Sequence, residues 1–286
     1  MRETNGYWYS AYRRDLYADC QQCFGLCCAA LYFSTMDGFP QDKMPGVPCR
    51  NLSEDFRCNI HGDLWNRGLK GCISFDCFGA GQKVAQVSFA GRDWIKDTES
   101  AGQMFEVFLV MRHIHELLWY MADALSLPAT KSIHDELSQK FEEILQITTL
   151  SPESLLELDI VSLRESVNQL LLKTSELVRA DVWSKERTRP KKRKSYRRGA
   201  DLLGADLRRE DLTGANFRGA CLIGANLSGN TLKGADVIGA DFRDADIRRA
   251  DLSEVVFLTQ AQLNAAKGDR HTKIPKTLAP PNHWML

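Results

Sequence analysis

The chain has 286 residues, 44% of them hydrophobic, and its 37 basic residues are balanced by 37 acidic ones. This composition excludes a disordered chain, and the zero net charge argues against steering of the whole protein toward nucleic acid or an anionic membrane. No segment approaches the roughly 18 consecutive apolar residues of a membrane span, and the N-terminus lacks the apolar core of a signal peptide. We therefore expect a soluble, cytoplasmic protein.

The composition changes character near residues 95 and 195, and the basic run and the end of the repeat add further boundaries, so five parts are predicted. These are a Cys-rich metal-binding domain at 1–95, a helical domain at 96–184, a basic linker at 185–199, a pentapeptide-repeat β-helix at 200–259, and a C-terminal cap and tail at 260–286. The first part lacks the apolar periodicity of a large core, so a bound metal would supply the missing folding energy.

Eight of the nine cysteines lie in the first part of the chain. They are Cys20, Cys23, Cys27, Cys28, Cys49, Cys58, Cys72 and Cys77. In a reducing cytosol such a cluster is expected to bind metal or to do redox chemistry rather than to form disulfides. Thiolates are soft ligands that suit zinc, copper(I) and iron–sulfur clusters. The candidates are two four-ligand sites, one binuclear centre, or one four-ligand site with spare thiols, and His61 could replace one sulfur.

The middle of the chain has helical periodicity. Apolar residues recur at three- and four-residue steps over 104–121 and predict an amphipathic helix that ends before Pro128. A second helix is expected from Ser132, and the motif SPES at 151–154 predicts another helix start, with a capping serine and a proline in the first turn. A long Leu/Val series follows, and the helices together suggest a small bundle.

Three weaker sequence features are interpreted as structural and not as functional. His113 and Glu116 lie one helical turn apart, a spacing that can bind metal, but the full zinc-protease motif is absent and a satisfied or exposed helix position is favoured. The glycines of 78–82 lack the phosphate-loop pattern and indicate a turn. Cys221 lies within the repeat described below and is expected to face outward, away from the cysteine cluster.

The segment 185–198 carries nine basic residues and one glutamate. We favour an extended, solvated linker, because its like charges and proline oppose compaction. The alternative is a nucleic-acid patch. Its candidate contacts are Lys191, Lys192, Arg193, Lys194, Arg197 and Arg198.

Twelve consecutive pentads run from Ala200 to Thr259. The third position is apolar in all twelve, the first is alanine in nine, the second is Asp or Asn in nine, and the fifth is glycine in seven. A period of five fits neither a helix nor a strand, but it fits a chain that turns a corner every five residues and closes a coil after four pentads. The apolar and alanine positions should then point inward, while Asp, Asn and Gly form the corners.

This A(D/N)LXX pattern resembles the pentapeptide-repeat family. The resemblance implies a right-handed quadrilateral β-helix of about three coils, so the predicted fold class is multidomain α+β: a small Cys-rich metal-binding domain, a helical bundle and this β-helix. Residues 257–269 are expected to form a capping helix, with Leu258 and Leu263 covering the last coil and Gly268 as its stop. The tail is expected to pack back through Trp284.

The segments CQQCFGLCC, CRNL, CNI and CISFDCF, within residues 20–78, resemble the zinc- or iron-chelating cysteine-cluster family, which includes flagellin lysine-N-methylase-like proteins. That resemblance implies that the eight clustered cysteines are the metal ligands. The whole layout resembles bacterial pentapeptide-repeat proteins, some of which are labelled oxetanocin A resistance proteins.

The expected function is therefore a cytoplasmic metal-binding protein, with zinc, iron or an iron–sulfur cluster, whose repeat is a platform for a protein partner. We favour a non-catalytic protein without a membrane role. The alternatives are an antibiotic-resistance or drug-target-protection protein, and an iron–sulfur enzyme or a redox or iron sensor. The repeat has ten acidic and seven basic residues, a net charge of 7 − 10 = −3, which is too close to neutral for a DNA mimic.

Overall fold

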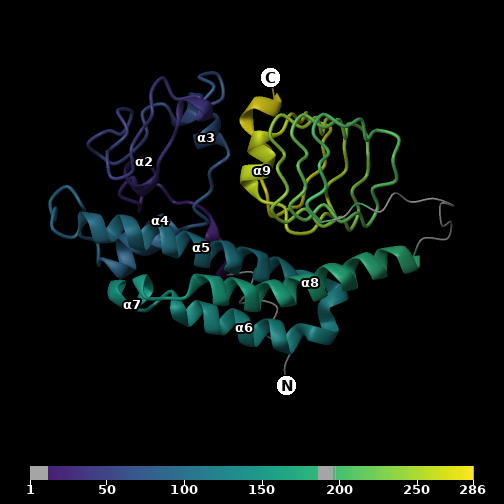
Figure 1. Cartoon of the computed structure of the whole chain (residues 1–286), viewed down its shortest axis with the longest axis horizontal. Helices are drawn as coiled ribbons and strands as arrows, with labels where there is room; N and C mark the ends of the chain where they lie inside the picture. Colours follow the sequence, from purple (N-terminus) through teal and green to yellow (C-terminus); the bar gives the residue numbers. More distant parts are fainter. Residues whose placement is uncertain (1–11, 186–195, 197, 286) are drawn as a thin grey trace. The chain divides into compact units, whose positions relative to one another are not determined.

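The structure is a computed structural model that describes residues 12–185, 196 and 198–285. It divides into two compact units (Figure 1). The first, here the thiol unit, contains the described residues up to Cys72 together with Asp76–Ser126 and Ser132–Leu171. The second, here the repeat unit, contains Ile73–Phe75, Leu127–Lys131 and the described residues from Leu172 onward. The finer five-part division of the sequence stays a prediction.

Four helices form the main body of the middle region. They are α5 (Ala101–Ser126), α6 (His134–Ile147), α7 (Pro152–Leu156) and α8 (Ile160–Lys185). A 3-10 turn over Pro128–Ile133 joins α5 to α6, and the Ser151 hydroxyl accepts a hydrogen bond from the Ser154 N–H at 3.3 Å to begin α7. The predicted helix start at 151–154 and the Pro128 boundary are thus confirmed, whereas the second helix begins at His134 and not at the predicted Ser132. Within the described ranges, no helix is long and apolar enough to cross a membrane.

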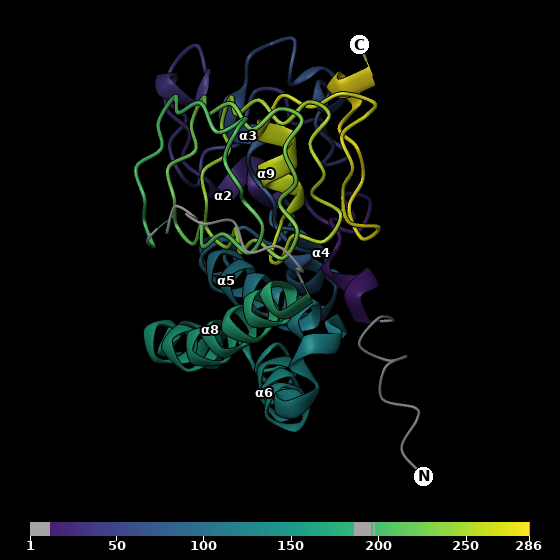
Figure 2. The ribbon, with the colours of Figure 1, turned by 90° about the vertical axis from the view of Figure 1, so that its right-hand side faces the viewer.

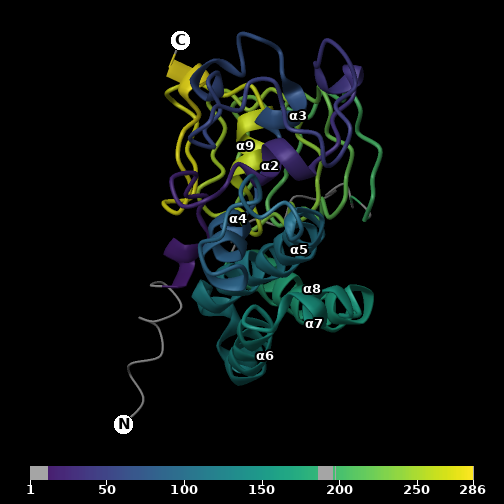
Figure 3. The same cartoon turned by 90° about the vertical axis from the view of Figure 1, so that its left-hand side faces the viewer.

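The thiol unit is otherwise built from short elements joined by turns (Figure 3). They are 3-10 turns at Arg13–Leu16, Thr35–Asp37 and His61–Asp63, the helices α2 (Leu26–Ala30), α3 (Lys70–Ile73) and α4 (Ala80–Lys83), and a π-helical turn at Val84–Ser88. Helices α2 and α4 pack against α5. A small separate core holds Phe33, Phe39 and Leu69, with the two phenylalanine rings stacked at 4.8 Å.

The pentads form successive coils whose partners are twenty residues apart, as in Asp201 with Cys221 and Cys221 with Asp241 (Figure 2). Backbone hydrogen bonds join the coils, for example from the Leu222 N–H to the Asp241 carbonyl at 3.0 Å. Apolar third-position side chains fill the interior: those from Leu207 to Phe257 are all buried. The second-position carboxylates and amides bond to the N–H two residues on, which confirms their predicted role in the corners.

The predicted α+β class is nevertheless wrong. The described residues contain helices, turns and isolated bridges of one residue pair each, but no β-strand and no sheet, so the predicted C-terminal quadrilateral β-helix is not present. The cause is the shortness of the period. Each pentad spends its fourth and fifth residues on a turn, so only the second residue is bridged to its neighbours before the chain bends again.

The end of the repeat is covered as predicted, with one correction. Helix α9 (Gln260–Ala265) begins with a capping box between Thr259 and Gln262, and Leu258 and Leu263 are buried. The helix ends at Ala265, so the prediction of Gly268 as its stop is wrong. Gly268 instead lies beneath Trp284, where an added Cβ would come within 2.4 Å of the indole. The Trp284 Nε1 donates to the Ala266 carbonyl at 3.1 Å, which confirms the predicted return of the tail.

The chain after α9 continues the coil pairing beyond the twelfth pentad. Lys267 is bridged to Asp246, and Lys273 is bridged to Asp251. Sequence inspection missed this continuation, because the segment lacks the pentad pattern.

The C-terminal part of α8 belongs to the repeat unit and packs on one column of pentad corners. Trp183 donates from Nε1 to the Thr213 carbonyl at 3.1 Å, and the Arg179 Nε donates to the Gly214 carbonyl at 2.9 Å. Gly214 and Gly234, which are equivalent residues of successive coils, lie directly under this helix. A Cβ on Gly214 would approach the Trp183 ring to 2.4 Å, so the helix can pack this closely only on glycine.

Candidate metal centre

The first four cysteines surround the start of α2. Gly25 precedes the helix with φ 63°, a left-handed conformation that favours glycine. An added Cβ there would lie 2.6 Å from the Leu52 Cδ1, so the loop carrying the later cysteines approaches this position closely. Helix α2 then places Cys27 and Cys28 side by side, and both are half-buried.

The second pair of cysteines is joined to α2 through the backbone. The Cys49 N–H donates to the Cys28 carbonyl at 2.9 Å. Cys58 is bridged to Leu52 in a short antiparallel turn, and the Leu52 N–H donates to the Cys49 carbonyl at 2.9 Å. These bonds fix one end of the loop against Cys28.

The last two cysteines come from the elements that precede α5. Cys72 lies on α3, and Cys77 directly precedes the left-handed Phe78 and Gly79 that begin α4. The predicted turn at 78–82 is thus correct for its first residues and wrong for Ala80 onward, which are helical. A Cβ on Gly81 would lie 2.6 Å from the Cys23 Sγ, so a glycine is needed where α4 faces this sulfur.

The eight sulfurs form a single network centred on Cys28, and none is in a disulfide. Cys28 accepts hydrogen bonds from Cys27 and Cys58. It also interacts electrostatically with Cys20, Cys23 and Cys72. Cys49 joins through Cys72, and Cys77 joins through Cys27.

Most of these thiols are held neutral. Burial raises the pKa of Cys23 to about 11 and that of Cys72 and Cys77 to about 12. The pKa of Cys27 is raised because its thiol donates to Cys28, and burial adds to the shift. Cys28 is the exception: the hydrogen bond from Cys27 lowers its pKa, and Lys43 contributes in the same direction. The neighbours of Cys28 therefore favour its thiolate form.

Lys43 places a buried ammonium group beside these sulfurs. Its Nζ donates to the carbonyls of Ala29 and Met44 at 3.1 and 3.2 Å, and to that of Leu31 at 2.5 Å. Burial lowers its pKa, while the charges of Cys49 and Cys28 act in the opposite direction. Sequence reasoning missed this residue, because a lone lysine in a loop carries no signal of burial.

The thiols are close, but they are not arranged as a finished coordination site. Across residues 12–185, 196 and 198–285, no three His, Cys, Asp or Glu side chains form a group that could hold a metal ion as they stand. A metal would therefore require side-chain rotation toward sulfur–metal distances of about 2.3 Å.

Other positions noted in the sequence are not among the eight clustered cysteines. The side chain of His61 is exposed, and its backbone N–H donates a hydrogen bond to the Cys58 carbonyl at 3.2 Å. His113 and Glu116 are both bound by Arg164 of α8, at 2.9 and 3.4 Å, which confirms an ordinary structural position. Cys221 is half-buried within the repeat unit.

Of the predicted nucleic-acid contacts, only Arg198 is described, and it is exposed. The others, Lys191, Lys192, Arg193, Lys194 and Arg197, lie outside the described residues. The nucleic-acid interpretation of this segment stays a prediction.

Helix α5 carries another buried titratable group. His115 is fully buried, and its Nδ1 donates to the Phe78 carbonyl at 2.8 Å, since a carbonyl can only accept. Its Nε2 has no hydrogen-bond partner within the described part of the chain. Burial lowers the pKa of His115 to about 4, so the ring is neutral.

Coils of pentads with buried third positions define a pentapeptide-repeat protein. The family model for pentapeptide repeats matches residues 198–229 and 221–257, with 8 copies. The chain is also 58% identical over 270 residues to the uncharacterized protein YybG of Bacillus subtilis (strain 168), a match that covers 94% of this chain and 95% of that relative. The chain belongs to the same family as YybG. The resemblance to the cysteine-cluster family and the resistance label stay predictions.

Proposed function

We propose that the thiol unit binds a thiophilic metal, zinc or iron, and that the repeat unit presents a surface to a protein partner. The observation that carries the first half is the network of eight free thiols around Cys28. Soft sulfur donors at this density suit zinc, iron or an iron–sulfur cluster far better than calcium or magnesium.

The local environment fits such a ligand set. A site with four thiolates and one divalent ion carries a net charge of about −2, which is costly to bury without a counter-charge. The ammonium of Lys43 supplies one positive charge at the sulfurs. The glycine at position 81 leaves space for the Cys23 Sγ, and the backbone bond from Cys49 to Cys28 holds two potential ligands together.

Metal affinity tests this half of the proposal. The reduced, metal-free chain is titrated with zinc against a chromophoric chelator, beside Cys28→Ser and the matched control Cys221→Ser. We expect wild type and the Cys221 variant to bind alike and the Cys28 variant to bind at least about tenfold more weakly, since a thiolate ligand is lost. Equal affinities in all three proteins would contradict a site in the thiol unit.

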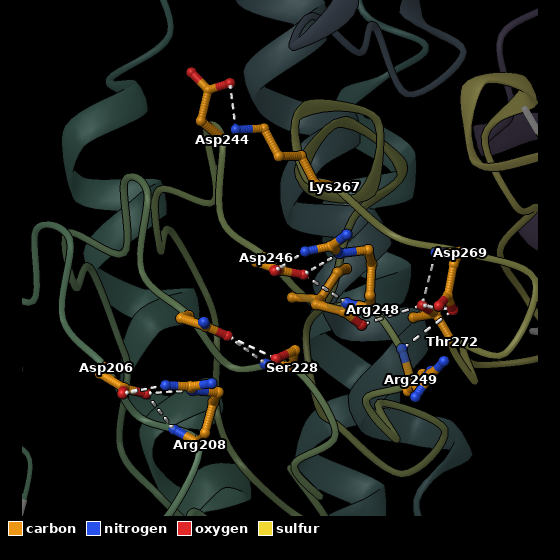
Figure 4. A network of polar contacts seen from close by, with 12 residues as sticks. Asp206, Arg208, Ser228, Asp244, Asp246, Arg248, Arg249, Lys267, Asp269 and Thr272 are labelled. Atoms are coloured by element: carbon orange, nitrogen blue, oxygen red, sulfur yellow. Dashed lines mark hydrogen bonds and ion pairs between the residues drawn. The ribbon is translucent and has the colours of Figure 1, made fainter.

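The second half of the proposal, a surface for a protein partner, rests on one side of the repeat. We call it the arginine face, and it consists of Asp206, Arg208, Ser228, Asp246, Arg248 and Arg249 (Figure 4). Arg208 and Arg248 each donate to both oxygens of the aspartate two residues earlier, at 2.6–2.9 Å. A groove of about 360 Å³ lies between Ser228, Arg249 and Asp269. These pairs hold the guanidinium groups in fixed positions, which lowers the entropy cost of a partner contact.

The partner expected here is a protein that presents carboxylates. The Arg208 and Arg248 charges are offset by aspartates, whereas the Arg249 side chain makes no ion pair or hydrogen bond among the described residues. A photo-cross-linking amino acid placed at position 249 should capture a partner in cells. The same group at exposed Leu203, on a neighbouring side of the coil, should not. Equal capture from both positions, or none from either, would count against this surface.

A further inference from the structure

A cavity of about 510 Å³ lies beside the thiol network, and Cys49 and Lys43 form part of its wall. All the residues that line it lie between Gly38 and Leu69, inside the thiol unit. Its volume is in the range of pockets that hold small organic ligands, typically about 300–1,000 Å³. The proposed metal function does not account for this space.

Part of the cavity wall is apolar. Phe39 and Leu69 are buried there and belong to the same small core against which Cys49 packs. Met44 and Val47 also line the cavity and are more than half exposed, at 57% and 54%. An apolar wall that continues into exposed apolar side chains favours a ligand with a hydrophobic body.

The charged part of the lining is positive overall. It contains three cations, Lys43, Arg50 and Arg67, and one acidic residue, Asp42. Asp42 already accepts hydrogen bonds from the Thr35 N–H at 2.9 Å and the Tyr32 hydroxyl at 3.0 Å, so its carboxylate is fixed.

The three cations differ in what they already bind. Lys43 bonds to backbone carbonyls, and Arg67 pairs with Asp63 at 2.8 Å. Arg50 is exposed and makes no ion pair or hydrogen bond within the described residues. It is therefore the cation in the lining that is able to receive an anionic group without giving up a partner.

We propose that this cavity binds a small organic anion, with its acidic head at Arg50 and its hydrophobic body against Phe39 and Leu69. The ligand would lie beside Cys49 and so at the edge of the thiol network. This inference goes beyond the proposed metal function and does not depend on it, because Arg50, Phe39 and Leu69 are not among the proposed metal ligands.

Two fluorescent probes test the proposal on the full chain, both metal-free and zinc-treated. 8-Anilinonaphthalene-1-sulfonate carries an anionic head on an aromatic body, and N-phenyl-1-naphthylamine is the same body without the charge. We expect saturable binding of the sulfonate to one site per chain, and about tenfold weaker binding to Arg50→Gln, since a charge-assisted contact is lost. Arg50→Lys should bind the sulfonate nearly as wild type does.

Arg57→Gln is the matched control, because Arg57 is an exposed arginine of the same unit that does not line the cavity. The neutral probe should bind wild type and Arg50→Gln alike. Circular dichroism of each variant identifies any loss of fold. An equal effect of Arg50→Gln and Arg57→Gln, no effect of either, or an equal loss for both probes would overturn the proposal. Failure of zinc binding with intact sulfonate binding would overturn only the metal function.

Discussion

At the scale of single residues, the fifth position of most pentads adopts a left-handed backbone conformation that turns the chain. Its seven glycines all have positive φ, from 62° to 69°, and Asp244 and Arg249 adopt the same conformation at 57° and 59° without being glycine. Residues with a Cβ are strained in this region by about 1 kcal/mol or more. The repeat therefore tolerates local strain at its later corners.

Replacing Arg249 by glycine should remove that strain. We expect Arg249→Gly to raise the free energy of unfolding of the repeat unit by about 1 kcal/mol, the strain released less the extra entropy of the unfolded chain. Arg209→Gly is the control, because Arg209 occupies the same pentad position without a positive φ. It should be neutral or destabilising. Urea unfolding followed by tryptophan fluorescence measures both, and a stabilising Arg209→Gly would refute this explanation.

His115 should make the thiol unit less stable in acid. Its folded-state pKa of about 4 lies below the ordinary value of 6.5, so the unfolded chain binds the proton more readily. The stability it contributes is complete above pH 6.5 and is lost as the pH falls toward 4. The full loss is about 3 kcal/mol, at about 1.4 kcal/mol per pKa unit.

His115→Asn keeps a donor for the Phe78 carbonyl but does not titrate in this range. Urea unfolding of the reduced, metal-free proteins should show wild type losing stability relative to this variant as the pH falls. Parallel pH profiles for the two proteins would show that His115 does not become protonated on unfolding.

At the scale of elements, α8 is attached to the repeat through glycine corners. Gly214→Ala should cost well over 1 kcal/mol, because the new methyl group meets the Trp183 ring in addition to the backbone strain. Gly224→Ala is the matched change: its φ of 64° is nearly the same, but nothing lies within 4 Å of the added Cβ. The difference between the two unfolding free energies isolates the helix contact, and equal costs would mean that α8 does not pack there.

These elements also show what a sequence can predict. The pentad period predicted the coil length, the buried third positions and the corner bonds, because each follows from a local pattern repeated many times. It could not predict strands correctly, because strand formation depends on how many consecutive residues pair between coils. Gly214 and Gly224 look alike in the sequence, and only the packing of α8 distinguishes them.

Part of the candidate site was likewise predictable from the sequence, and part was not. Cysteine spacing identified the thiols, whose residue type carries the chemistry. The burial of Lys43 and the cavity beside Cys49 arise from irregular contacts among loop residues, and no spacing rule predicts such contacts.

At the scale of the whole molecule, metal binding should be coupled to protons. Since burial raises the pKa values of Cys23, Cys72 and Cys77 to about 11 or 12, these thiols are protonated at neutral pH before they bind. Zinc bound by four such thiols should release up to about four protons, fewer if the Cys28 thiolate is one ligand. Calorimetry in buffers of different ionisation enthalpy counts them. Binding without proton release would contradict ligation by these sulfurs.

The central claim is that the thiol unit holds a metal in the cell. The most direct test is elemental analysis of the full chain purified without oxygen or chelators, together with the number of thiols that react with a disulfide reagent before unfolding. We predict about one or more equivalents of zinc or iron per chain, with most clustered thiols unreactive until the metal is removed. A metal-free chain whose clustered thiols all react at once in the folded state would contradict the account.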